Sequence, residues 1–201
     1  MAMAAGELNL VPAEIYVDGS IKRPGQKEAD GPPEWAGAAW VMPPSEWGAD
    51  WTGQYYALGL RTNNENVELE AIFFALKHVT ARQTGKERMS SEIVIYCDCN
   101  NALLRLRAVL DRGEDEDCAL VGKVVSMMLT LDRDHGIPVR LVWVPAHRGI
   151  EGNERADTLA KKASALSEDG FGWQGWWASA GSPFESFEIV SPWAPDSLQN
   201  H

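Results

Sequence analysis

Four acidic residues lie in or next to segments whose pattern predicts burial, where a charged side chain is uncommon. Asp18 and Asp98 each follow a short apolar run typical of a buried strand, and Glu68 and Asp157 lie within stretches of helical periodicity. If the two strands are parallel neighbours, ~5 Å apart, their carboxylates lie side by side at the ligand-binding edge of the sheet. Close carboxylates repel, so one must bind a proton or a cation must lie between them. A hard cation with oxygen ligands suits this arrangement best.

The two helical acids are expected on the sheet side of their helices. The 3.6-residue period places Glu68 on the same arc as an apolar stripe and Glu70 on the opposite side, facing water. Asp157 flanks a second apolar stripe. The two stripes consist of Ile72, Ala75, Leu76 and Val79, and of Ala156, Leu159, Ala160 and Ala163. Four such carboxylates form a candidate two-metal centre, which activates water and stabilises the leaving oxygen of a phosphodiester.

Each acid taken alone also has an ordinary structural explanation. An Asp at a strand end commonly forms a turn, as Asp18 does in this alternative. An acid in the first turn of a helix complements the macrodipole, which would suffice for Glu68. Asp157 alone suits a solvated helix surface. The prediction of a metal centre therefore depends on the four side chains converging in space, which spacing alone does not establish.

One histidine has the right setting for proton transfer. His147 follows a strand pattern and lies between Pro145 and Gly149, in a loop that is able to move. Histidine exchanges protons near neutral pH. The alternative is an exposed loop histidine without a role. His78 and His135 receive no role from the sequence.

The elements that must position these residues follow in the order βββαβααβα. Three strands with short connections predict an antiparallel meander, and two later strands can run parallel to the first, in an α/β domain with a mixed sheet. The expected strands are Glu14–Asp18, Trp35–Met42, Trp51–Leu58, Ile93–Cys97 and Pro138–Val144. The expected helices are Asn66–Arg82, Asn100–Leu110, Ala119–Asp132 and one capped by Asn153 that runs to Leu166. We expect a lead over residues 1–13, a catalytic domain over 14–166 and an extension over 167–201.

Composition limits the classes of function. The chain has 201 residues and a net charge of -11, which argues against a broad basic surface for nucleic acid. Any nucleic acid is then bound through local contacts and metal ions. Three cysteines form no disulfide framework, and Cys97 and Cys99 are expected in the core rather than on a metal. No apolar run approaches the ~18 residues of a membrane span. We expect an intracellular protein, in the cytoplasm or nucleus.

Five segments, in order, resemble the motifs of type 1 ribonuclease H, and the similarity covers about Glu14 to Leu166. The final block, from Val144 to Ala160, also resembles the ribonuclease H domains of retroelement polyproteins and their eukaryotic relatives. The segments are Tyr16–Ser20 (YVDGS), Asn66–Ile72 (NVELEAI), Ile95–Asn100 (IYCDCN), Trp143–Gly149 (WVPAHRG) and Gly152–Asp157 (GNERAD).

The resemblance implies a ribonuclease H-like five-stranded mixed sheet, with three antiparallel and two parallel strands, flanked by helices. It implies a metal-dependent endonuclease that hydrolyses the RNA strand of RNA–DNA hybrids to 3′-hydroxyl and 5′-phosphate ends, with two Mg²⁺ ions or Mn²⁺ in their place. The implied metal ligands are Asp18, Glu68, Asp98 and Asp157, and the implied role of His147 is in proton transfer or product release. The implied substrate contacts are Ser20, Asn63, Asn64, Asn100 and Asn153.

The chain also departs from this family. Many cellular members carry a basic, Trp-containing protrusion that grips the hybrid, whereas residues 113–117 read Gly-Glu-Asp-Glu-Asp. We therefore expect weak, strongly magnesium-dependent hybrid binding. The segment from Asn63 and Asn64 to Glu68 is one residue longer than the family pattern.

The acidic, Trp-rich extension over residues 167–201 either docks on the domain or binds a protein partner. Two other functions stay open, namely a nuclease for a different duplex and a retroelement-derived interaction module that uses this extension.

Overall fold

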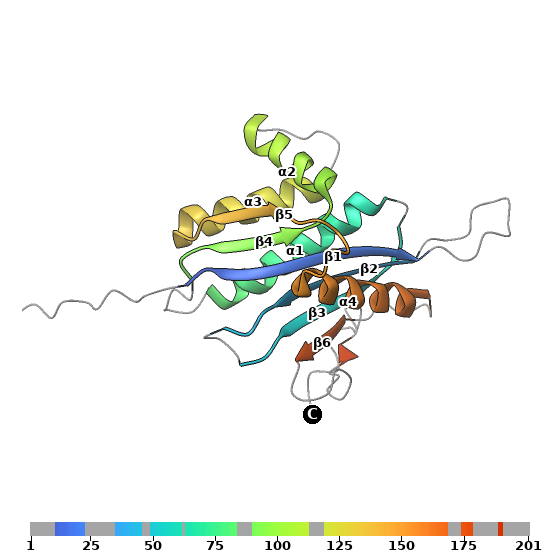
Figure 1. Cartoon of the computed structure of the whole chain (residues 1–201). Helices are drawn as coiled ribbons and strands as arrows, with labels where there is room; N and C mark the ends of the chain where they lie inside the picture. Colours follow the sequence, from blue (N-terminus) through green and yellow to red (C-terminus); the bar gives the residue numbers. More distant parts are fainter. Residues whose placement is uncertain are drawn as a thin grey trace, which may run out of the picture.

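The chain folds as a mixed β-sheet with helices on both faces (Figure 1). The computed structural model describes residues 11–22, 35–45, 49–61, 63–83, 90–112, 119–168, 174–178 and 189–190. The strands are β1 (Ala13–Lys22), β2 (Trp35–Met42), β3 (Thr52–Leu60), β4 (Ile93–Cys97), β5 (Val139–Trp143), β6 (Gln174–Ala178) and β7 (Ile189–Val190). The helices are α1 (Asn64–Gln83), α2 (Asn100–Arg112), α3 (Ala119–His135) and α4 (Glu151–Glu168).

The strand order of the sheet is β5-β4-β1-β2-β3-β6-β7. The first three strands form the expected antiparallel meander, and β4 runs parallel to both β1 and β5. The expected five-stranded mixed sheet with flanking helices is therefore confirmed. Because β1 is central and has a parallel neighbour, side chains from its middle meet those that follow the end of β4.

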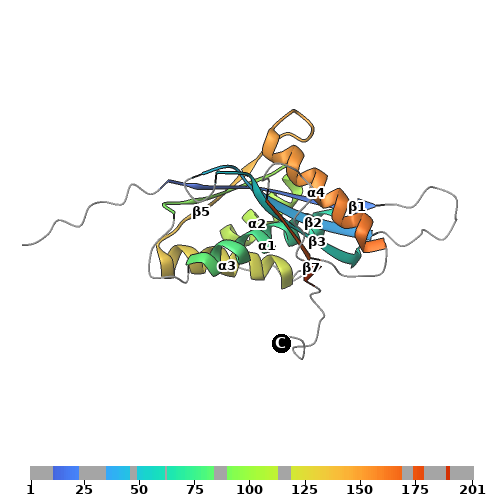
Figure 2. The same cartoon turned by 90° about the horizontal axis from the view of Figure 1, so that it is seen from below.

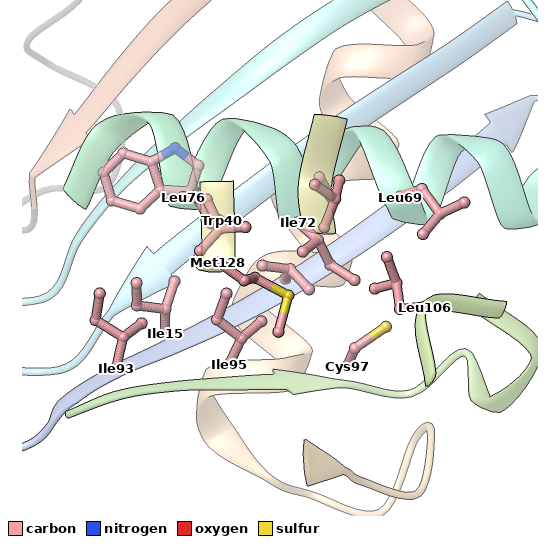
Figure 3. Close-up of a cluster of buried hydrophobic side chains, with 14 of the residues drawn as sticks. Ile15, Trp40, Leu69, Ile72, Leu76, Ile93, Ile95, Cys97, Leu106 and Met128 are labelled. Atoms are coloured by element: carbon pink, nitrogen blue, oxygen red, sulfur yellow. The ribbon is translucent and has the colours of Figure 1, made fainter. Parts of the chain in front are cut away.

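Two apolar cores hold the helices against the sheet. Figure 2 shows α4 on one face, and α1, α2 and α3 on the other. In the larger core, Leu69, Ile72 and Leu76 of α1 pack over Ile93 and Ile95 of β4 (Figure 3). The smaller core lies between α4 and the meander and includes several alanines of the helix. These small side chains let α4 lie close to β2, which fixes the helix that carries Asp157.

The first strand is longer than the sequence predicts, and that prediction of its end was wrong. Gly19 and Ser20 do not stop β1, because the strand continues to pair with β2 as far as the partners Lys22 and Trp35. Asp18 consequently lies within a strand, and not at a turn. This excludes the turn-forming explanation for Asp18.

The C-terminal extension adds two short strands to the outer edge of the sheet. β6 pairs antiparallel with β3, and β7 pairs with β6. This pairing places the backbone of 174–178 against β3; whether the aromatic side chains of the extension dock on the domain or bind a partner stays a prediction. The acidic turn at 113–117 lies outside the described residues, and so does most of the extension.

Within the described residues, no helix combines the length and the apolar character needed to cross a lipid bilayer.

Candidate metal centre

The parallel pairing of β1 and β4 brings two of the predicted acids to the same level. Tyr16 lies opposite Tyr96 in this register, so the residue two positions after Tyr16 on β1 lies level with the residue that directly follows the end of β4. Those residues are Asp18 and Asp98. Asp18 is 5% exposed, so it is a carboxylate held inside the protein.

Glu68 reaches the same point from the first turns of α1. The residue is 2% exposed, which agrees with the core-facing position expected from the helical period. Gly19 makes this approach possible, because a Cβ atom at that residue would lie 2.7 Å from the backbone nitrogen of Glu68 and 2.8 Å from the carbonyl carbon of Val67. A side chain on Gly19 would therefore push α1 away from β1. The Asp-Gly pair in the sequence serves close packing and not a turn.

Three carboxylates thus converge. One oxygen from each of Asp18, Glu68 and Asp98 lies within 4.8 Å of the oxygens of the other two. Asn153 of α4 donates a hydrogen bond from Nδ2 to Asp98 Oδ2 at 2.9 Å. The Sγ atom of Cys97 lies 3.9 Å from Glu68 Oε2. These neighbours orient the carboxylates but carry no positive charge.

The electrostatic consequence is a strong preference for protonation in the absence of a cation. Burial, followed by the negative charges of Asp98 and Asp157, raises the pKa of Asp18 well above its usual range, and Lys161 lowers it in part. Burial, followed by the charges of Asp18 and Asp98, also raises the pKa of Glu68 well above its usual range. A hydrogen bond from the Gly19 backbone opposes the rise at Glu68. The arrangement therefore favours a bound cation over charged carboxylates alone.

Asp157 contributes a partly buried carboxylate, 16% exposed, from the α4 side of the site. It lies on α4, and its negative charge contributes to the raised pKa of Asp18, so it belongs to the same electrostatic centre. Lys161, one turn further along α4, donates a hydrogen bond to Asp157 Oδ2 at 2.7 Å. This contact raises the pKa of Lys161. Asp157 already has a counter-ion within the chain, whereas no described residue forms an ion pair with the three acids at the sheet.

The predicted histidine lies beside Asp157, together with an acid that sequence reasoning missed. Potential ligand atoms of His147, Glu154 and Asp157 lie within 4.8 Å of one another. The His147 side chain is 67% exposed, so it can meet a substrate from solvent. The missed residue is Glu154. A signal for it existed, because Glu154 and Asp157 are three residues apart and therefore share one helical face.

The five predicted substrate contacts lie in different settings. Ser20 is half-buried on β1, on the same face as Asp18. Asn63 and Asn64 are exposed at the start of α1, where Asn63 Oδ1 accepts a hydrogen bond from the Asn66 backbone at 3.2 Å and so caps the helix. Asn100 is exposed at the first residue of α2. Contacts of these residues with nucleic acid stay predictions.

Two sequence expectations about single residues were wrong. Asn153 does not cap α4, because the helix begins at Glu151. Asn153 is instead 1% exposed, and its side chain is used to hold Asp98. Glu70 does not face water freely, because its side chain is only 18% exposed and lies 3.1 Å from Arg61 Nε in an ion pair.

The residues at this site fit a hard divalent cation. The donor set consists of carboxylate oxygens, the ligands that Mg²⁺ and Mn²⁺ prefer. Two oxygens on one octahedral Mg²⁺ lie roughly 3 to 4 Å apart, because each bond is about 2.1 Å long. Oxygens within 4.8 Å of one another reach that spacing by small side-chain movements. The buried Asn153 Oδ1 also has no hydrogen-bond partner among the described residues, which leaves it able to accept one from a ligand or water.

Three converging carboxylates, two of them buried, with a further acid on the last helix, form the arrangement expected of a metal-dependent nuclease of the ribonuclease H type. The family model for RNase H matches residues 12–165. The chain therefore belongs to the RNase H family. The enzyme class expected from the sequence, a ribonuclease H, is confirmed at this level.

Solved structures of related folds agree with this assignment. LC9-RNase H1, a type 1 RNase H with the type 2 active-site motif, is 19% identical with a TM-score of 0.55, over 81% of this chain and 76% of that one. LC11-RNase H1 in complex with an RNA/DNA hybrid is 23% identical with a TM-score of 0.51, over 78% and 99% of the two chains. The protease-reverse transcriptase of prototype foamy virus is 20% identical with a TM-score of 0.53, over 76% and 20%. These similarities establish the fold, in both cellular-type and retroviral settings.

Proposed function

We propose that the protein hydrolyses the RNA strand of RNA–DNA hybrids by a two-metal mechanism. The observation that carries the proposal is the convergence of Asp18, Glu68 and Asp98, with Asp157 beside them, on the fold of the RNase H family. The complex of LC11-RNase H1 with an RNA/DNA hybrid supports this class of substrate by analogy. The fold by itself hosts other substrates, so the choice of duplex needs its own test.

The proposed metal ligands are the four carboxylates. Asp18, Glu68 and Asp98 would hold one divalent ion at the buried side, and Asp157 would help to hold a second. When bound, the ions neutralise the carboxylates and stabilise the charge that develops on the phosphate in the transition state. We take Mg²⁺ as the resident ion, with Mn²⁺ able to replace it.

The chain's own residues supply position and proton transfer. Water attacks the phosphorus, the bond from phosphorus to the 3′ oxygen breaks, and the products carry a 5′-phosphate and a 3′-hydroxyl. His147 lies at the exposed edge of the site, where its ring can take up a proton or assist product release. Asn153 fixes one oxygen of Asp98, which limits the directions in which that carboxylate can bind.

Substrate contacts are proposed for the exposed residues around this edge. Ser20, Asn63, Asn64 and Asn100 provide neutral hydrogen-bonding groups and no positive charge. Weak hybrid binding that depends strongly on magnesium follows from such contacts. A protein partner for the C-terminal extension stays a prediction, and the backbone pairing of β6 with β3 neither requires nor excludes it.

The experiment compares three labelled duplexes, an RNA–DNA hybrid, double-stranded RNA and double-stranded DNA, each with Mg²⁺ or with a chelator. Cleavage confined to the RNA strand of the hybrid and dependent on Mg²⁺ is the expected result. Cleavage of another duplex would assign a different nuclease. Absence of cleavage on every duplex with added Mg²⁺ or Mn²⁺ would overturn the proposal.

A further inference from the structure

The loop that carries His147 has an unusual backbone. His147 has φ 52° and Gly149 has φ 74°, so two residues of this short connection between β5 and α4 are left-handed. Glycine adopts this conformation readily, but a histidine does so only where surrounding contacts hold it. The position of the His147 ring therefore depends on whatever fixes the loop.

Glu154 makes the contacts that can fix it. Its Oε1 atom accepts a hydrogen bond from the Gly149 backbone at 3.2 Å. Its Oε2 atom lies 4.0 Å from Nδ1 of His147. Its own backbone N–H donates to the Ile150 carbonyl at 3.0 Å, which ties the carboxylate to the first turn of α4. One side chain thus reaches both left-handed residues from a rigid helix.

A general role at the helix start does not explain these contacts. Glu151 also lies in the first turn of α4, and it complements the helix dipole equally well. Its carboxylate accepts hydrogen bonds from Arg155, at 2.8 Å and 3.1 Å, and the contacts described for it do not include the loop. The direction of the Glu154 carboxylate, toward the loop, is therefore specific to that residue.

We propose that Glu154 is a positioning residue that holds the loop so that the His147 ring faces Asp157. The proposal rests on the function proposed above, because it gives His147 its reason to be positioned. Glu154 acts through His147 and the Gly149 amide, and it is not assigned to the metal or to the substrate.

The first test needs neither metal nor activity. In metal-free protein, hydrogen exchange of the Gly149 amide is measured by NMR for the wild type and for Glu154→Ala, with Glu151→Ala as the matched control. We expect exchange at Gly149 to become at least ~10-fold faster in Glu154→Ala and to stay unchanged in the control. Glu154→Gln keeps an oxygen that accepts the hydrogen bond, so it should retain most of the protection. Unchanged exchange in Glu154→Ala would overturn the proposal whatever the enzyme cleaves.

The second test is a double-mutant cycle on hybrid cleavage. Glu154→Ala should lower kcat about as strongly as His147→Ala does, with KM nearly unchanged, and the double variant should be no slower than His147→Ala alone. Multiplicative losses would mean that Glu154 acts independently of His147 and would overturn the proposal. A protein that cleaves no hybrid would contradict the proposed function, and the exchange experiment would still decide the role of Glu154.

Discussion

The two sides of the carboxylate site are built in different ways. On the buried side, Asp18 and Glu68 are almost completely enclosed, at 5% and 2% exposure, and they repel each other and Asp98. On the α4 side, Asp157 is partly buried, at 16% exposure, and has Lys161 as a counter-ion. The packing of β1, β4 and α1 brings the carboxylates of the buried side together. The pair of Asp157 and Lys161, in contrast, results from the spacing of four residues along one helix.

This difference indicates a division of work within the site. The buried carboxylates gain the most from a divalent ion, because burial and mutual repulsion disfavour their charged forms. Asp157 must exchange Lys161 for an ion, so we expect weaker and more transient binding there. Under the proposed two-metal mechanism, we therefore expect a persistent ion at the sheet and a second ion that binds together with substrate.

The largest effect is expected on the buried side. Asp18→Asn should lower hybrid cleavage by about 10³-fold or more, because several kcal/mol of transition-state stabilisation depend on the ion that it holds. Asp157→Asn should cost less, since Lys161 already compensates that charge. Initial rates at saturating Mg²⁺ compare the two variants. A greater loss of activity for Asp157→Asn than for Asp18→Asn would contradict the conclusion that the buried carboxylates contribute most to metal binding.

Packing around Gly19 should matter nearly as much. A methyl group at this residue would displace the start of α1, so we expect Gly19→Ala to lower cleavage on the order of 10²-fold and stability by roughly 1–3 kcal/mol. Chemical denaturation and initial rates measure both effects. The matched control is Gly122→Ala, an exposed position of α3 where a Cβ atom meets nothing within 4 Å. That variant should be unchanged or slightly more stable, and equal effects at both glycines would contradict the role of close packing.

The His147→Ala variant tests the part of the site around Asp157 without removing a proposed metal ligand. His147→Ala should lower kcat by on the order of 10²-fold, the lower end for loss of an acid–base group. Mg²⁺ affinity should stay the same, because the carboxylates are intact. Kinetics and calorimetry on the same preparation provide the two values. A loss of Mg²⁺ affinity in this variant would assign His147 to the metal rather than to proton transfer.

The smallest expected effect is on stability. The pKa values of Asp18 and Glu68 are raised in the folded protein, so the folded state holds these protons more tightly than the unfolded state. Their stabilising contribution is complete below the ordinary carboxyl range, about pH 4, and is lost as the pH rises through the raised values. In chelator, Tm should therefore fall by a few degrees from mildly acidic to neutral pH. Added Mg²⁺ should reduce the fall, and Asp18→Asn should flatten it. A pH dependence that Asp18→Asn leaves unaltered would point to other groups.

The sequence predicts the buried acids well and their surroundings poorly. Asp18 and Asp98 follow apolar runs, and the parallel order of their strands follows from the βββαβααβα pattern, so their meeting can be inferred. The function of Gly19 cannot be inferred from the sequence, because it depends on how closely α1 and β1 approach in three dimensions. The same holds for Asn153, since a residue that looks like a helix cap lies inside the first turn and contacts another motif.

Loops and edges escape prediction for related reasons. The contact of Glu154 with Gly149 depends on left-handed backbone angles that local sequence permits but does not require. The pairing of β6 with β3 depends on a free sheet edge being present at the right distance along the chain. Each of these features is a tertiary contact between segments whose local patterns have other, simpler explanations.

The central claim is that the buried carboxylates bind the divalent ion. It is tested most directly by calorimetric titration of Mg²⁺ into substrate-free protein, comparing Glu68→Gln with Glu70→Gln, the same change two residues apart on α1. Glu70 is ion-paired with Arg61 and lies outside the carboxylate cluster. We predict that Glu68→Gln weakens Mg²⁺ binding at least ~10-fold and that Glu70→Gln binds like the wild type. Equal affinity of the Glu68→Gln variant and the wild type would contradict the account.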